Sequence, residues 1–176
     1  MAAGGEPAPV AVALARAKAE AVTAQRPGAV VLAADTIVVL DGRLLGKPGD
    51  AGEASRMLAV LRQRAHVVIT GVAIVGPDRR WEESASTRVW MRTYSEPEVE
   101  ASIVRGDPFD KAGAYAIQDP ILRPVRRIAG CRCNVIGLPL ATVAAGLARF
   151  GIRTPAEVLA GLPRERRRCF AEAGLV

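Results

Sequence analysis

The chain has 176 residues, of which half are hydrophobic, so it can form a domain with a sizeable core. The 24 basic and 18 acidic residues give a formal net charge of +6, which suits an anionic partner such as a nucleotide. No apolar run approaches the ~18 residues of a membrane-spanning helix, and the first residues lack the pattern of a secretory signal. We therefore expect a cytoplasmic location and no membrane partner.

The arginines are clustered, with one group in 123–127 and another in 164–168. Because only 4% of the residues are aromatic, the sequence offers no platform on which bases could stack. We therefore do not expect nucleic acid as a partner. We expect residues 1–8 and 163–176 to be poorly ordered.

The cysteines are Cys131, Cys133 and Cys169, and His66 is the single histidine. An odd number of cysteines does not indicate a disulfide framework, and one histidine argues against a Cys/His zinc site. We expect reduced thiols. For His66, which has no second histidine or paired carboxylate nearby, we expect a structural or hydrogen-bonding role.

The first part of the chain predicts a helix, a strand and a hairpin. An alanine-rich run over 9–25 favours helix. The apolar run 29–34 does not alternate, which is typical of a strand buried on both faces. An Asp-Gly pair within 37–45 then predicts a tight hairpin.

The middle of the chain contains two capping-box patterns, which predict helices over 50–64 and 95–106. Between them, the Val- and Ile-rich segment 65–75 and the amphipathic segment 80–93 predict a second hairpin.

The last part predicts short strands over 113–117 and 125–128, and helices over 140–150 and from Thr154 onward. The sum is a single α/β domain over 1–176, with a mixed twisted sheet flanked by helices. Two lobes, if present, would share the sheet.

Asp35 follows the apolar run 29–34 directly. A carboxylate at the carboxyl end of a strand lies where open α/β sheets bind ligands. It could hold a divalent metal or take a proton from an attacking water. The alternative is that Asp35 caps a turn.

Two further segments carry groups that suit a nucleotide. Lys47 lies between a glycine and a proline, and Lys111 opens a segment that ends in Gln118. Each lysine could meet a phosphate, and the amide of Gln118 could read a base edge. Taken singly, residues of this kind are more often structural or surface residues than functional ones.

Four segments, ADTIVVLDGRLLGKP, HVVITGVAI, KAGAYAIQ and CNVIGLPL, follow one another in that order. This series resembles the Maf family of nucleoside triphosphate pyrophosphatases over about residues 12–148. The resemblance implies a two-lobed fold around a nucleotide cleft, similar to that of inosine triphosphatases. It also implies a homodimer, a divalent cation such as Mg²⁺, and cleavage between the α and β phosphates.

The resemblance assigns roles to six positions. Asp35 matches the family's proton acceptor and a metal ligand. Lys18, Lys47 and Lys111 match its cleft lysines, and Thr36 and Gln118 match positions linked to base choice. Gln118 stands where the 7-methyl-GTP branch has a glutamate, so the sequence resembles the dTTP/UTP branch.

The sequence departs from the family pattern in two places. It contains no Ser-x-Ser-x-Arg-Arg loop ahead of the first helix. We expect that the natural start lies upstream; the alternative is a shortened, catalytically weak protein that binds nucleotides. Asp119-Pro120 also replaces a glycine-rich turn after Gln118, and Asp119 either adds a carboxylate to the site or forms a turn.

Overall fold

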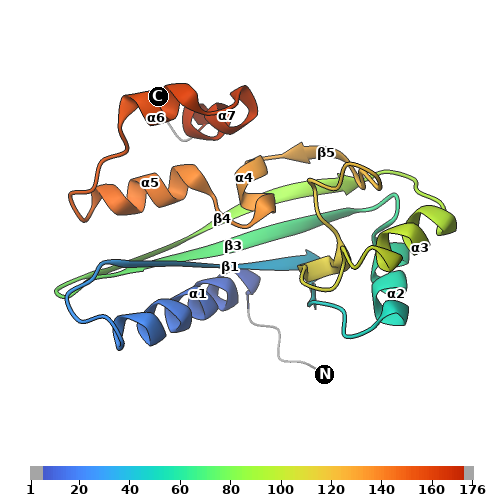
Figure 1. Cartoon of the computed structure of the whole chain (residues 1–176), viewed down its shortest axis with the longest axis horizontal. Helices are drawn as coiled ribbons and strands as arrows, with labels where there is room; N and C mark the ends of the chain where they lie inside the picture. The colour runs from blue at the N-terminus through green and yellow to red at the C-terminus, as the bar shows by residue number, and fades with distance from the viewer. Residues whose placement is uncertain (1–5, 173–176) are drawn as a thin grey trace. The chain divides into compact units, whose positions relative to one another are not determined.

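The computed structural model describes residues 6–172, which form five strands, seven α-helices and one 3-10 helix (Figure 1). In chain order these are α1 (Pro7–Thr23), β1 (Val31–Leu40), β2 (Arg43–Leu45), α2 (Ala51–Leu61), β3 (Ala65–Val75), β4 (Arg80–Met91), α3 (Glu96–Val104), η1 (Ala112–Ala114), β5 (Val125–Ala129), α4 (Arg132–Ile136), α5 (Leu140–Ala148), α6 (Ala156–Gly161) and α7 (Arg164–Glu172). The strands form one sheet in the order β2-β1-β3-β4-β5. The predicted α/β class is confirmed, and no described helix has the length and apolarity that a membrane span requires.

The chain divides into two compact units. The first contains the chain up to Thr36, Ile69–Ser86 and the chain from Gly130 onward. The second contains Ile37–Val68 and Thr87–Ala129. The boundaries fall inside β1, β3 and β4, so these three strands contribute residues to both units.

In the first unit, helices cover both faces of the strands. Ala73 of β3 packs against Ala15 and Ala19 of α1, whereas Val72 and Ile74 pack on the other face, where Val143 of α5 lies. Figure 1 shows α1 and α5 on opposite sides of the strands. The arrangement follows from the period of two along a strand, which sends neighbouring side chains to opposite faces.

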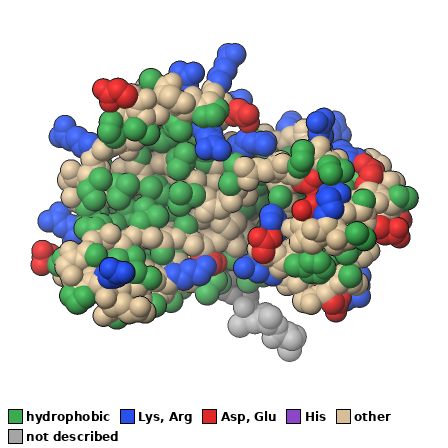
Figure 2. Space-filling view, in the orientation of Figure 1, with side chains coloured by type: hydrophobic (Ala, Val, Ile, Leu, Met, Phe, Trp, Pro, Cys, Tyr) green, Lys and Arg blue, Asp and Glu red, His purple; other side chains and the backbone are tan. Residues whose placement is uncertain are grey.

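The first half of β1 is only half-buried, although we expected a strand buried on both faces. The reason is its neighbours: β2 pairs only with Val38–Leu40, so residues 31–36 form an edge among the described strands. Figure 2 shows hydrophobic side chains gathered over the strands between α1 and α5. β1 also runs without a break through Asp35, which therefore lies within the strand and not at its end.

In the second unit, the β1–β2 hairpin confirms the prediction from the Asp-Gly pair. Leu40 pairs with Arg43, and the two turn residues have positive φ, 49° at Asp41 and 75° at Gly42. A two-residue turn with both φ angles positive matches the twist of an antiparallel pair. β4 and β5 pair antiparallel as well.

The predicted strand over 113–117 is wrong. Gly113 has φ 73° and Ala114 has φ 61°, which extended backbone does not allow, and a 3-10 turn forms over Ala112–Ala114. The backbone N–H of Gly113 donates to the carbonyl of Gly46, 2.9 Å away, and this long-range hydrogen bond holds the turn. The short helix α4 was not predicted.

The C-terminal part ends in a helix. The arginine-rich segment forms α7, which packs on α4 and α5, and basic side chains protrude from the α6–α7 region (Figure 2). At the other end α1 begins at Pro7. The remaining positions of the segments expected to be poorly ordered, 1–5 and 173–176, lie outside the described residues.

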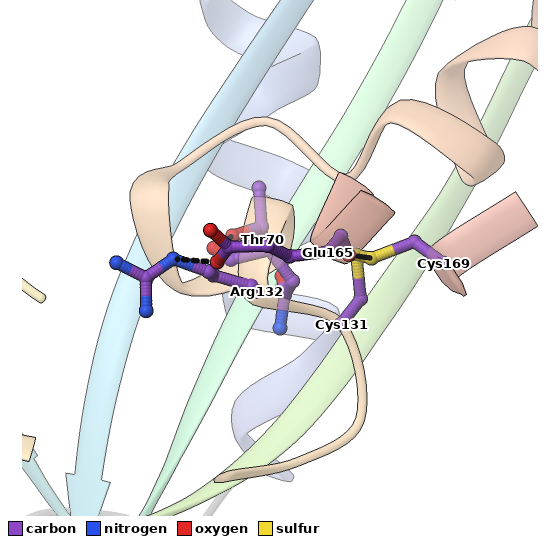
Figure 3. Close-up of a disulfide and its surroundings, with 6 residues drawn as sticks. Thr70, Cys131, Arg132, Glu165 and Cys169 are labelled. Atoms are coloured by element: carbon purple, nitrogen blue, oxygen red, sulfur yellow. Dashed lines mark hydrogen bonds and ion pairs between the residues drawn. A yellow bond between two sulfur atoms is a disulfide. The ribbon is translucent and has the colours of Figure 1, made fainter. Parts of the chain in front are cut away.

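The expectation of three reduced thiols is also wrong. Cys131, which precedes α4, forms a disulfide with Cys169 of α7, with 5.2 Å between their Cα atoms (Figure 3). Close by, Arg132 pairs with Glu165 at 3.1 Å. A pairing across 38 residues depends on the packing of α7 against α4, which cysteine spacing alone does not show.

Candidate functional site

Asp35 and Lys18 form an ion pair in the first unit. Lys18 lies on α1 beside Ala15 and Ala19, the two alanines that pack against the sheet. Asp35 has the same parity on β1 as Ala33, which packs on that alanine cluster, so its carboxylate faces α1. The Asp35 side chain is 17% exposed and that of Lys18 is 59% exposed. The pair therefore presents a largely buried carboxylate beside a cation that water can reach.

Thr36 faces the opposite side of the sheet from Asp35, because consecutive strand residues point to opposite faces. Its Oγ1 lies 2.8 Å from Oγ1 of Thr70, and Thr70 donates to the backbone carbonyl of Asn134 in α4 at 3.1 Å. A hydroxyl has one proton to donate, so Thr36 must be the donor in the Thr36–Thr70 bond. Thr36 can then bind a ligand only by accepting a hydrogen bond from it.

The second unit brings together Lys47 and Lys111. The Gly113–Gly46 hydrogen bond ties the two segments that carry them. Lys111 Nζ lies 2.5 Å from Asp110 Oδ1. The hydrogen bond from Lys111 lowers the pKa of the Asp110 carboxyl below its usual range, and the charge of Lys47 lowers it further. One carboxylate thus bonds Lys111 and lies within electrostatic reach of Lys47.

Asp110 is a member of this cluster that the sequence analysis did not identify. The sequence feature that could have indicated Asp110 is its position directly before Lys111. Adjacent opposite charges are, however, common on protein surfaces. Only the approach of the Lys47 segment distinguishes this acid from others.

Gln118 lies exposed in a turn of the second unit, not at the end of a strand. The next residue begins a second turn: Asp119 Oδ1 accepts hydrogen bonds from the backbone N–H groups of Ile121 and Leu122 at 2.8 and 2.9 Å. Its other oxygen accepts from Arg105 at 3.2 Å. Of the two roles considered for Asp119, the turn-forming one is confirmed. The amide of Gln118 is left accessible to a ligand.

The sequence matches a known protein family over most of the chain. Residues 2–150 match the family model of Maf-like proteins. The chain belongs to the Maf family.

Curated Maf proteins named dTTP/UTP pyrophosphatase are similar to this chain over most of its length. The Thermomicrobium roseum protein is 59% identical over 134 residues, covering 76% of this chain and 62% of that protein. The Koribacter versatilis protein is 44% identical over 150 residues, covering 85% and 78%. The Symbiobacterium thermophilum protein is 44% identical over 145 residues, covering 82% and 75%. The matched stretch is thus less than two thirds of the Thermomicrobium protein's own length.

In this Maf chain, the buried side chain of His66 supports the KAGAY segment, residues 111–115. Nε2 of His66 lies 2.7 Å from the hydroxyl of Tyr115, and the two rings meet edge to face. Both side chains are buried. The hydrogen-bonding role expected for His66 is confirmed, and it supports the segment that begins at Lys111.

We expect His66 to make the protein less stable in mild acid. Burial lowers the pKa of His66 from 6.5 to about 4. The unfolded chain therefore binds a proton that the folded protein does not, and stability falls as the pH drops from about 6.5 towards 4. The loss between pH 7 and pH 5 should be about 2 kcal/mol, measured by urea unfolding at each pH.

The matched variant for this measurement is His66→Gln, whose amide can still bond Tyr115 but does not titrate. We expect a smaller stability difference between pH 7 and pH 5 in this variant. Equal pH dependence in both proteins would assign the acid sensitivity to other groups.

Proposed function

We propose that this chain is a nucleoside triphosphate pyrophosphatase that hydrolyses dTTP and UTP to the monophosphate and pyrophosphate. The observation that carries the proposal is the Asp35–Lys18 pair, a largely buried carboxylate with an exposed cation beside it. Support for the substrate comes from the similar Maf proteins, which are named dTTP/UTP pyrophosphatases.

In this reaction Asp35 accepts the proton of a water molecule that attacks the α-phosphorus. The bond from the α-phosphorus to the bridging oxygen breaks, and pyrophosphate leaves. A positioned general base typically contributes about 10²–10⁴-fold to the rate. Lys18, whose ammonium group reaches solvent, can meet a phosphate oxygen while it keeps the Asp35 carboxylate oriented.

Lys47 and Lys111 are proposed to bind phosphate oxygens. Lys111 bonds the Asp110 carboxylate in the second unit, and Lys47 lies within electrostatic reach of it. A phosphate oxygen can replace that carboxylate as the partner of Lys111, since both are anionic acceptors. Before the nucleotide binds, the Asp110 carboxylate would occupy the place of a phosphate and keep the lysines positioned.

Thr36 and Gln118 are proposed to take part in base choice. Because Thr36 donates its proton to Thr70, it can only accept from the base, and the N3–H of thymine or uracil is a donor. The amide of Gln118 both donates and accepts, which suits the carbonyl-flanked edge of the same bases.

The residues also fit a divalent cation that arrives with the substrate. Mg²⁺ is usually held by one or two carboxylates together with phosphate oxygens and water. Asp35 can supply one such oxygen, while the phosphates supply others; bound Mg²⁺ would neutralise charge on the triphosphate. The homodimer and the cytoplasmic location stay predictions.

The test is a panel of nucleoside triphosphates with Mg²⁺, in which monophosphate and pyrophosphate are both quantified. We expect the two products in equal amounts and the highest kcat/KM with dTTP or UTP. Release of inorganic phosphate instead of pyrophosphate would contradict the proposed bond cleavage. Nucleotide binding without turnover would support the alternative of a catalytically weak nucleotide-binding protein.

A further inference from the structure

All three cysteines of the sequence meet in the first unit. Cys131 precedes α4, Cys133 lies in the first turn of α4, and Cys169 lies in α7. Their sulfur atoms all lie within 4.8 Å of one another. Cys133 and Cys169 are 3% and 5% exposed, so the sulfur cluster is largely shielded from water.

The disulfide between Cys131 and Cys169 does not account for the third sulfur. Cys133 is a buried free thiol beside that bond. A disulfide needs two cysteines, and its link between α4 and α7 would be the same with a small apolar residue at position 133. Many zinc sites, in contrast, have three protein ligands and leave the fourth position to an outside ligand. The three sulfur atoms that lie together here match that number of protein ligands.

Two arginines lie near the cluster, and one of them, Arg132, is paired with Glu165. Burial raises the pKa of the Cys133 thiol, whereas Arg166 and Arg132 lower it, so both guanidinium groups lie within electrostatic reach. Three thiolates and one divalent cation carry a net charge of −1. Nearby arginines offset such a charge, which is otherwise costly to bury.

We propose that, once the disulfide is reduced, Cys131, Cys133 and Cys169 bind one thiophilic divalent cation of the Zn²⁺ class. A dithiol reductant supplies two electrons and two protons to the disulfide and is itself oxidised to a disulfide. The cation then displaces the three thiol protons and leaves its fourth position to water.

The geometry needs only small adjustments. A tetrahedral site with Zn–S bonds of about 2.3 Å places its sulfur atoms about 3.8 Å apart. The three sulfur atoms lie within 4.8 Å of one another while the disulfide is formed. After reduction the sulfur atoms of Cys131 and Cys169 move apart, and rotations of the three side chains can bring all three sulfur atoms to the spacing of such a site. A site of this kind contains no histidine, so the single histidine of the chain does not argue against it. In both redox states the cysteines link α4 to α7.

The experiment uses the full chain, reduced with a phosphine and desalted without oxygen, and titrated with Co²⁺ as a probe. We expect one Co²⁺ per chain, with an intense sulfur-to-cobalt charge-transfer band that Zn²⁺ abolishes by displacement. Native mass spectrometry with Zn²⁺ should show one bound ion and the loss of the displaced protons. The oxidised protein should show neither signal.

Cys133→Ser is the decisive variant, because it leaves the disulfide partners intact. It should lower Co²⁺ affinity at least about tenfold and weaken the charge-transfer band. His66→Gln is the control and should bind like the wild type. No charge-transfer band in the reduced wild-type protein would overturn the proposal, and so would binding that Cys133→Ser leaves unchanged.

Discussion

Replacing Asp35 with asparagine should lower kcat/KM for pyrophosphate release from dTTP by about 10²–10⁴-fold, the usual contribution of a general base. Asparagine has nearly the same shape as aspartate, but its amide cannot take a proton from water at neutral pH. The Asp35→Asn variant should still fold, because Lys18 is largely exposed and can be solvated when it loses its partner. Initial rates over a range of dTTP concentrations measure the effect.

Asp41→Asn is a matched control for this variant. Asp41 also pairs with a basic residue, Arg64, but it lies at the tip of the β1–β2 hairpin. Its φ of 49° suits asparagine as well as aspartate, so the turn should be kept. We expect wild-type kcat/KM for this variant. If Asp35→Asn retained the same activity as Asp41→Asn, Asp35 would not be the proton acceptor.

Gly71→Ala should destabilise the protein by about 3 kcal/mol or more, at the upper end of what overpacking a core costs. Gly71 lies in β3 and faces the backbone of α1. A Cβ atom at this position would lie 2.3 Å from backbone atoms of Ala11. Backbone cannot rotate away as a side chain does, so the whole helix must shift. Urea unfolding at neutral pH measures the change in free energy.

The control for Gly71→Ala is the same substitution at Gly46, where a Cβ atom would have no neighbour within 4 Å. We expect this variant to stay within about 0.5 kcal/mol of the wild type. Because α1 also carries Lys18, we expect Gly71→Ala to lower pyrophosphatase activity, whereas the free energy of unfolding tests the packing alone. Equal stability of the two variants would show that α1 does not lie close to Gly71.

Several features of the fold were predictable because they depend on residues close together in the sequence. The Asp-Gly pair predicted the β1–β2 turn, since both residues accept positive φ. Ser95 and Glu98 predicted the start of α3, where the backbone N–H of Ser95 donates to the Glu98 carboxylate at 2.7 Å. The order of four sequence segments was enough to identify the Maf family, which the family model confirms over residues 2–150.

The candidate site was predictable in part. The sequence predicted Lys18 and Asp35, which form an ion pair in the structure. It also predicted Lys47 and Lys111, which both act on the charge of one carboxylate. It did not show that this carboxylate is Asp110, nor that Thr36 faces away from Asp35. The parity of a strand residue follows from its register against neighbouring elements, and a continuous strand through Asp35 was not expected.

By itself, the sequence determined the helix caps, the hairpin turn and the types of residue available for chemistry. Each of these follows from backbone preferences and hydrogen bonds within a few residues. The tertiary structure alone decided the Cys131–Cys169 bond, the close approach of α1 to Gly71 and the turn at Gly113. Those features join segments tens of residues apart, and their energies depend on packing that local sequence patterns do not encode.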